Sequence, residues 1–145
     1  MPTTPTPAPA AFDFLDLSYR PDLGVLNIRW LRSVSFGEMQ QGFQAALREG
    51  QQQATRWLVD VRRRTELEAD SSQWVARQLL PQAAAQVAPA VLRVAYLLSP
   101  ARAELLRSNE ALREATTAAQ APTQPYRLQT FLDEGPAVQW LQTAG

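Results

Sequence analysis

The feature that most constrains this chain is a short apolar run at residues 57–61, broken only by Asp60, that leads into three arginines. A continuous apolar run of this length is typical of a strand that is covered on both faces, as in a parallel sheet. Residues 91–98 (Val-Leu-Arg-Val-Ala-Tyr-Leu-Leu) have the same character. We therefore expect two buried strands in the interior of a mostly parallel sheet.

Two further strands are expected before this run. Residues 12–19 and 25–30 alternate between apolar and polar side chains, and the turn formers proline and glycine lie between them. This pattern predicts an antiparallel hairpin with one face partly open to water, and a turn in which Gly24 is able to take a positive φ. A phase slip in the alternation at residues 14–15 is interpreted as a β-bulge.

Helices are expected after the second strand and after each later one, because a capping residue precedes each helical pattern. The expected caps are Ser35, Asp70, Ser99 and Asp133. Ser35 and Glu38 form a capping box, and Pro81 should end or kink the second helix. With a last strand at residues 126–132, the order is β-β-α-β-α-β-α-β-α. It predicts a single α/β domain over residues 12–145, with a mostly parallel central sheet and an N-terminal antiparallel hairpin.

Residues 1–11 are rich in proline, threonine and alanine and carry no charged side chain. Alternate prolines prevent regular hydrogen bonding, so we expect a disordered tail here. The tail lacks the basic start and apolar centre of a secretory signal. No later stretch is apolar over the length that a membrane span needs, and we expect a cytoplasmic protein without a membrane span.

The composition excludes several kinds of chemistry. The 145 residues include no cysteine, histidine or lysine, and the formal net charge is +0. These absences exclude thiol chemistry, histidine general bases, Schiff bases and a phosphate-binding lysine. The balanced charge gives no electrostatic reason to expect nucleic acid as a partner. We therefore expect a protein that is not an enzyme and that has no cofactor and no metal site.

Asp60 is a candidate phosphoacceptor or metal ligand, because the carboxyl ends of strands in open α/β sheets face the usual ligand crevice. Its companions are missing, however. A receiver-type site needs a lysine, and a haloacid-dehalogenase-type site needs a second aspartate where Arg62 stands. We favour the alternative that Asp60 accepts hydrogen bonds from nearby backbone amides or pairs with an arginine.

The arginines after this strand precede a helix whose N-terminal amides carry partial positive charge, so together they are a candidate site for an anion or a protein partner. The residues of this candidate loop are Asp60, Arg62, Arg63, Arg64 and Trp74. The alternative, which we favour, is a solvated loop whose charge is offset by Glu66, Glu68 and Asp70. The spacing of these three acidic residues matches no calcium-binding loop.

A candidate apolar pocket is formed by Phe36, Phe43 and Trp74. The apolar residues of the first helix recur at helical spacing, at Phe36, Met39, Phe43, Ala46 and Leu47. Such a stripe is more often a core face than a ligand site, and we favour the core face. An exposed Trp30 or Trp74 would instead mark a partner surface or the mouth of a pocket.

Several short patterns resemble one known family. They are Val-Leu-Asn-Ile-Arg-Trp at residues 25–30, Leu-Val-Asp at 58–60, Arg-Val-Ala-Tyr at 93–96, and the closing Phe131, Ala137 and Trp140-Leu141. Together with the element order, they resemble the SpoIIAA-like members of the STAS superfamily, small bacterial proteins often grouped with CRAL-TRIO lipid-binding domains. The resemblance covers residues 12–141. It implies a STAS-like fold and a role in signalling through protein–protein interaction.

In bacterial anti-sigma factor antagonists of this family, the phosphorylated serine lies in an Asp-Ser-Ser-Gly motif at the start of the helix after the central strand. Asp70-Ser71-Ser72-Gln73 is similar, with glutamine in place of glycine and a longer preceding loop. By position the resemblance makes Ser72 the candidate phosphoacceptor, with Ser71 beside it. Helix capping explains the same residues without any function, and we favour capping.

Two functions remain open from the sequence. The first is a non-enzymatic, STAS-like interaction module that binds a protein partner through the face around residues 62–74. The alternative is a protein that binds a small apolar or amphiphilic, lipid-like ligand near the candidate pocket. A large continuous pocket would favour the ligand, and a flat apolar patch beside the arginines would favour the partner. A homodimer is also expected, because closed two-fold dimers are common among soluble proteins.

Overall fold

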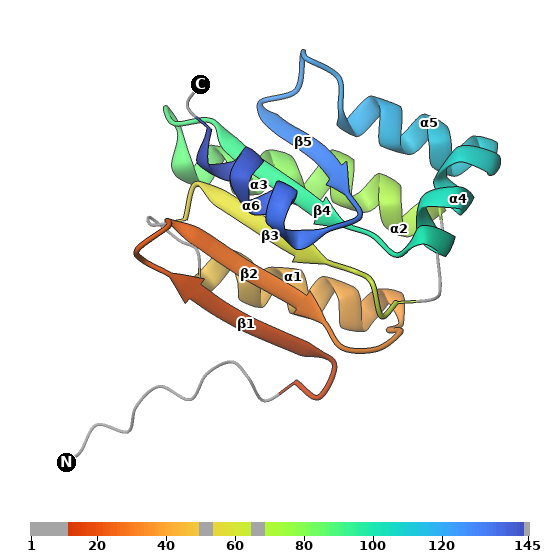
Figure 1. Cartoon of the computed structure of the whole chain (residues 1–145), viewed down its shortest axis with the longest axis horizontal. Helices are drawn as coiled ribbons and strands as arrows, with labels where there is room; N and C mark the ends of the chain where they lie inside the picture. The colour runs from red at the N-terminus through yellow and green to blue at the C-terminus, as the bar shows by residue number, and fades with distance from the viewer. Residues whose placement is uncertain (1–11, 50–53, 65–68, 144–145) are drawn as a thin grey trace.

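The computed structural model describes residues 12–49, 54–64 and 69–143, and it shows a single α/β domain built on one five-stranded sheet (Figure 1). The strands are β1 (Leu15–Arg20), β2 (Val25–Trp30), β3 (Arg56–Asp60), β4 (Leu92–Leu97) and β5 (Tyr126–Phe131). They lie in chain order across the sheet. β1 pairs with β2 in antiparallel orientation, and every later pair is parallel. The predicted fold class is therefore confirmed.

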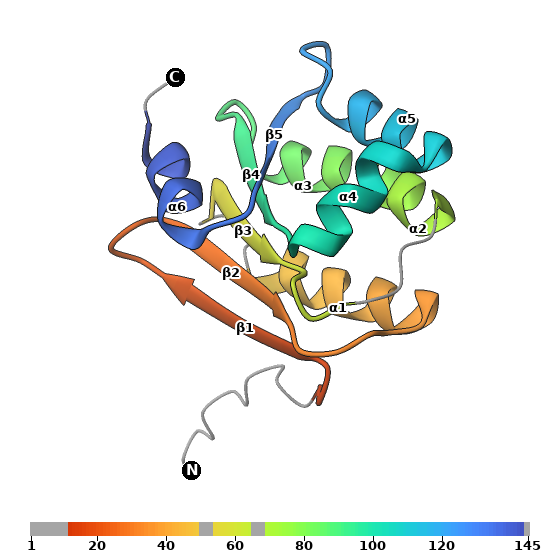
Figure 2. The same ribbon diagram turned by 45° about the vertical axis from the view of Figure 1, so that its right-hand side comes forward.

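The helices divide unequally between the two faces of the sheet. They are α1 (Phe36–Glu49), α2 (Ala69–Trp74), the π-helical turn η1 (Val75–Leu79), α3 (Leu80–Val87), α4 (Pro100–Ser108), α5 (Glu110–Ala119) and α6 (Glu134–Gln142). Figure 2 shows α1 to α5 on one face and α6 on the other. Because the strand order advances in one direction from β2 to β5, right-handed crossovers place every connecting helix on the same face.

The main core lies between the sheet and α1 to α5. Its largest fully buried side chains include Trp30, Trp57, Tyr126 and Phe43. The Trp30 ring stacks on Phe14 at 6.1 Å between centroids and meets Phe43 edge-on at 5.2 Å. A second, smaller core lies under α6, where Leu58 and Leu141 are among the buried residues. β3 is thus covered on both faces, as its apolar run predicts.

Two arginines from the strands hold the end of α6. Arg56 Nε donates to the carbonyl oxygen of Leu141 at 2.6 Å, and Arg93 Nη2 donates to that of Trp140 at 2.9 Å. The Arg93 guanidinium also lies over the Trp140 ring, 4.3 Å from its centroid. The last carbonyls of a helix lack intrahelical partners and carry partial negative charge, so the arginines both satisfy and neutralise them.

Most of the predicted local signals are confirmed. Ser35 and Glu38 form the capping box, with the Glu38 amide donating to Ser35 Oγ at 3.1 Å and the Ser35 amide to Glu38 Oε1 at 3.0 Å. Ser99 caps α4 by accepting from the Arg102 amide at 3.1 Å. Gly24 has φ +67° in the hairpin turn. Asp133 occupies the N-cap of α6, but its side chain makes no capping hydrogen bond.

Two expectations about local structure are wrong. The register of β1 against β2 is uninterrupted, so the slip at residues 14–15 is the start of the strand and not a bulge. At Pro81 the helix continues but changes type, since the π-helical turn η1 ends at Leu79 and α3 begins at Leu80 with Pro81 in its first turn. The helix after β3 already includes Ala69, so Asp70 lies in its first turn and not at its cap. The expected tail at residues 1–11 lies outside the described residues.

The close packing of α1 on the sheet can be tested at Gly42. A Cβ atom there would lie 2.6 Å from Trp30 Cη2 and 2.9 Å from Leu15 Cδ2. Gly42→Ala gains about 1 kcal/mol of helix propensity, but overpacking of a core costs about 1–3 kcal/mol. We expect a net loss of up to about 2 kcal/mol in the free energy of unfolding, measured with urea. Gly37→Ala is the control, since a Cβ there meets nothing within 4 Å, and a Gly42→Ala variant as stable as Gly37→Ala would contradict this packing.

Candidate functional site

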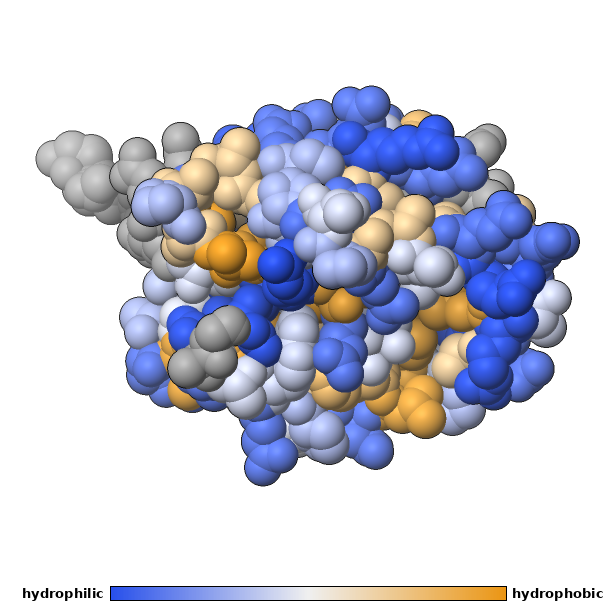
Figure 3. Space-filling model, turned by 90° about the horizontal axis from the view of Figure 1, so that it is seen from above, coloured by the Kyte–Doolittle hydropathy of each residue, from blue (hydrophilic) through white to orange (hydrophobic). Residues whose placement is uncertain are grey.

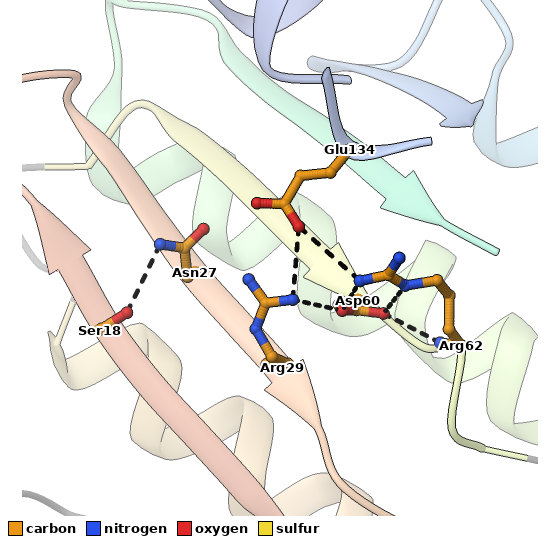
Figure 4. Close-up of polar contacts among 6 residues, drawn as sticks. All are labelled: Ser18, Asn27, Arg29, Asp60, Arg62 and Glu134. Carbon is orange, nitrogen blue, oxygen red and sulfur yellow. Dashed lines mark hydrogen bonds and ion pairs between the residues drawn. The ribbon is translucent and has the colours of Figure 1, made fainter. Parts of the chain in front are cut away.

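Asp60 lies at the carboxyl end of β3, at the centre of a charged cluster on the α6 face of the sheet (Figure 4). Its Oδ2 accepts from Arg29 Nη1 at 2.6 Å and from Arg62 Nη2 at 2.9 Å. Its Oδ1 accepts from Arg62 Nε at 3.0 Å and from the Arg62 amide at 3.1 Å. Glu134 at the start of α6 lies 3.5 Å from Arg29 and 3.7 Å from Arg62. The expected pairing of Asp60 with an arginine and a backbone amide is therefore what the structure shows.

The electrostatics of this cluster favour a carboxylate that stays ionised. Asp60 is 4% exposed, and this burial opposes ionisation. The hydrogen bonds and charge of Arg62, with the charge of Arg29, outweigh the burial, so the pKa of Asp60 lies below its usual value. Both carboxylate oxygens of Asp60 already accept hydrogen bonds from Arg29 and Arg62. Asp60 is therefore poorly suited to act as a nucleophile or a base.

The residues of the candidate anion- or partner-binding loop are not brought to one place. Arg62 lies on the α6 face with Asp60, and Arg63 is exposed. Arg64 lies on the opposite face and is only 6% exposed, with its guanidinium carbon 5.2 Å from the centre of the Trp30 ring. The turn at residues 62–63 separates the two arginines, so they cannot bind one small anion together.

The three aromatic residues of the candidate apolar pocket do meet. The Trp74 ring lies 5.9 Å from Phe36 and 6.4 Å from Phe43, between ring centroids. Phe43 is fully buried, Trp74 is half-buried and Phe36 is 39% exposed. The aromatic group is thus continuous from the core to the surface, and the core-face expectation holds for the stripe except at Phe36.

A cavity of about 80 Å³ lies beside this group, between the sheet and α2, η1, α4 and α5. Most of its wall is apolar. The apolar lining residues are Met39, Phe43, Val75, Ala76, Leu80, Leu98, Leu106, Ala115, Ala119 and Leu128. The polar lining residues are Arg64, Ser71, Tyr96, Arg102, Thr116 and Thr130. An apolar cavity with a few convergent polar groups is the usual character of a small-molecule site.

The hydroxyl groups in the cavity wall differ in whether they make hydrogen bonds within the protein. Thr116 Oγ1 donates to the carbonyl oxygen of Leu112 at 2.9 Å. In the part of the chain that the structure describes, the hydroxyls of Ser71, Tyr96 and Thr130 make no hydrogen bond to protein. Burial raises the pKa of Tyr96 to about 12 against the lowering effect of Arg64 and Arg102, so its phenol is a neutral donor at physiological pH. The oxygens of these hydroxyls are not among the fully buried side-chain atoms that lack a partner, so water or a ligand in the cavity can reach them.

Of the two candidate phosphoacceptors, the structure places Ser71 beside the cavity. Ser71 lines it and is 7% exposed, so an enzyme reaches its hydroxyl only if α2 moves. The side chain of Ser72 lies outside the described residues, as do Glu66 and Glu68 and the side chain of Asp70. Phosphorylation of either serine stays a prediction.

Comparison with known proteins leaves the family open. No protein-family model, curated protein or solved structure matches the chain. Within the described ranges, no three histidine, cysteine or acidic residues are grouped to hold a metal ion. None of the helices described there is both long and apolar enough to cross a membrane.

The sequence analysis did not identify four polar residues of the cavity wall, namely Tyr96, Arg102, Thr116 and Thr130. Tyr96 and Thr130 lie opposite each other in the register of β4 and β5, and Arg102 follows the Ser99 cap in α4. Alternation along each strand indicates that Tyr96 shares a face with Val94, and Thr130 with Leu128. Tyr96 and Thr130 come together only because β4 pairs with β5, and no local sequence pattern indicates which strands are paired.

The Asp60 cluster gives a pH-dependent prediction. We expect Asp60→Asn to lower the free energy of unfolding by about 1–3 kcal/mol at pH 7, since a buried carboxylate loses charged hydrogen bonds. Because the folded-state pKa of Asp60 is lowered, its stabilisation is present above the unfolded pKa of about 3.9 and is lost as pH falls through the folded value. The wild-type and variant values, measured by urea unfolding from pH 7 to 2, should begin to approach each other below about pH 4 and should converge only below the lowered folded pKa of Asp60.

Glu134→Gln is the matched control in the same cluster. Glu134 is half-exposed and its contacts exceed 3.4 Å, so we expect a loss below about 1 kcal/mol. Equal losses in the two variants at pH 7 would contradict the central role of Asp60.

Proposed function

We propose that this protein binds a small amphiphilic molecule in the cavity between the sheet and α2, η1, α4 and α5. The observation that carries the proposal is the cavity itself, whose mostly apolar wall includes the hydroxyls of Ser71, Tyr96 and Thr130. A few hydrogen-bonding groups that face a mostly apolar cavity can orient a small ligand within it. A ligand with one polar end and one apolar end satisfies both parts of the wall.

The lining residues support binding without chemical conversion. The described part of the wall has no carboxylate, and the chain has no histidine, cysteine or lysine to supply a base or nucleophile. Tyr96 is held in its neutral form by burial, which makes it a donor and not a base at physiological pH. We therefore propose a non-enzymatic binding protein.

The distribution of exposed apolar residues favours a ligand over a broad partner surface. Among the described residues, the large exposed hydrophobic side chains are Phe36, Val91, Leu105 and Leu132, which belong to different segments. On the face shown in Figure 3, hydrophobic residues form separate patches between hydrophilic ones. Scattered exposed hydrophobic residues are ordinary and do not by themselves mark an interface.

Filling the cavity should abolish binding. Ala115 lines the cavity from α5, so Ala115→Leu places new methyl groups inside it. We expect 1-butanol, a neutral amphiphile of suitable size, to shift the amide signals of Ser71, Tyr96 and Thr130 in two-dimensional NMR of the wild-type chain. In Ala115→Leu the apparent affinity should fall about tenfold or more.

The matched control is Ala111→Leu, which adds the same atoms at an exposed position of the same helix. Its butanol titration should equal that of the wild type. Loss of binding in both variants, or in neither, would argue against the cavity as the site. Thermal unfolding of each variant separates lost binding from lost folding.

A second candidate function is the STAS-like interaction module, regulated by phosphorylation. It is supported by the exposed Phe36, which contacts Trp74 near the serines at the start of α2. A phosphate on a serine at the start of α2 would add negative charge beside this exposed aromatic surface. Phosphorylation could then control the binding of a partner there. A second copy of the chain is one possible partner of this kind.

Phosphate mapping tests this candidate. If the protein is regulated in this way, mass spectrometry of the chain purified from its natural source should find one phosphate on Ser72. Ser71 should stay unmodified because its hydroxyl is buried in the cavity wall. An unmodified chain under all growth conditions would count against the switch.

A further inference from the structure

We infer that β1 forms the contact of a two-fold symmetric dimer, in which the outer edge of β1 pairs with the same edge of a second copy of this chain. The inference goes beyond the proposed function and does not depend on it. It follows from the open edge of β1, from the direction of its backbone groups and from the order of its side chains.

β1 is an edge strand whose outer backbone groups can be identified. The sheet order places β2 on one side of it and no described strand on the other (Figure 1). The Leu31 amide donates to the carbonyl oxygen of Phe14 at 2.9 Å, which extends the pairing of β1 and β2 by one residue. In an antiparallel pair, residues whose backbone groups face the partner strand alternate with residues whose groups face away. Since Phe14 faces β2, the backbone groups of Leu17 and Tyr19 face the open edge.

The side chains along this edge are accessible on both faces of the sheet. Asp16, Ser18 and Arg20 are exposed on one face. Leu17 and Tyr19 are half-buried on the other face, where they pack against the main core. A second strand along the edge would therefore meet polar side chains on one face and apolar ones on the other.

One register makes the edge complementary to itself. In an antiparallel pair with Ser18 on the two-fold axis, Asp16 faces Arg20 of the second copy. In the same register Leu17 faces Tyr19 of the second copy, and these two residues can exchange backbone hydrogen bonds because both point outward. The symmetry makes each contact twice. Opposite charges and pairs of aromatic and aliphatic side chains directly across from each other stabilise a sheet.

The neighbouring registers with the same backbone alternation lack this charge match. With Leu17 on the axis, Asp16 would face Ser18 of the second copy, which has no charge. With Tyr19 on the axis, Asp16 would lie toward Asp22 of the second copy, which has the same charge. The charges therefore select the register that is centred on Ser18.

The two charged residues are available for this contact. Asp16 has no ion-pair partner among the described residues. Arg20 pairs with Asp22 in its own turn at 2.7 Å, but the two side chains are 53% and 60% exposed. Such exposed pairs contribute little to stability, so Arg20 can turn to Asp16 of the second copy at little cost.

The other edge of the sheet does not have this property. The charged residue of β5 is Arg127, and the strand has no acidic residue, so two copies of β5 cannot match opposite charges. Charged side chains on an edge strand usually prevent pairing with other chains. In β1 they favour one partner, a second copy, and the two-fold pairing uses the edge of both copies, so the assembly closes as a dimer.

The test is a charge swap, measured by sedimentation equilibrium of the full chain. We expect a reversible dimer at about 100 µM chain, because one short strand pair is smaller than a standard interface. Asp16→Arg and Arg20→Asp should each raise the dissociation constant about tenfold or more, since two attractive contacts become repulsive. The double variant should return it to within about threefold of the wild type. Glu114→Arg, at an exposed position of α5, should leave it unchanged.

The double variant also controls for folding. It keeps the new aspartate beside Asp22, so recovery of the dimer would show that the loss in Arg20→Asp does not come from a damaged turn. Circular dichroism of each variant should match that of the wild type, because the changed side chains are exposed.

Single cysteines test the register, since the chain has no cysteine of its own. Ser18→Cys places two thiols across the axis, where the Cα atoms of such a pair are about 4.5 Å apart, within the range of a disulfide. Asp16→Cys places them about 14 Å apart along the strands, beyond that range. Under mild oxidation, Ser18→Cys should form a covalent dimer about tenfold or more faster than Asp16→Cys. A chain that is monomeric at every concentration, a dimer that the charge reversals leave unchanged, or equal cross-linking at both positions would each overturn the inference.

Discussion

Burial of β3 on both faces is the constraint on which the rest of the structure depends. Trp57 and Val59 enter the main core, while Leu58 meets α6 on the other face. A strand buried on both faces needs neighbours on both edges and helices above and below it, which a parallel sheet with crossover helices supplies. Asp60, at the end of this strand, carries a negative charge that needs a positively charged partner within the fold. Arg29 comes from the neighbouring strand and Arg62 from the following turn, and both lie within hydrogen-bonding distance.

Helix α6 covers the other face of the sheet, and there arginines bind backbone carbonyl groups and not a carboxylate. Ala137 and Leu141 fill the small core, and the arginines of β3 and β4 bind the last carbonyls of the helix. Arginine suits this position because its long stem packs along the sheet while its planar head reaches the carbonyls and stacks on Trp140. All the basic residues of this chain are arginines, and several of them stabilise the fold. They are Arg29, Arg56, Arg62 and Arg93.

The sequence predicts the fold well because its signals are local. The capping box at Ser35, the turn at Gly24 and the helix cap at Ser99 each follow from a few neighbouring residues. The π-helical turn before Pro81 is missed because a proline rule describes an isolated helix and not one held by a sheet. The separation of Arg62 from Arg64 is missed because alternation ends where the strand ends. The cavity is missed because Tyr96 and Thr130 are distant in the chain and meet only through strand pairing.

The cavity itself has a physical origin in α4. No residue of this helix is buried and Leu105 is 42% exposed, so α4 packs loosely over the sheet and places only Arg102 and Leu106 in the cavity wall. Tyr96 of β4 and Thr130 of β5 line the same cavity from the sheet. A core selected for stability alone closes such a space, since cavities lower stability. A cavity with hydroxyl groups in its wall, beside the buried Arg64, therefore supports the proposal of a binding site.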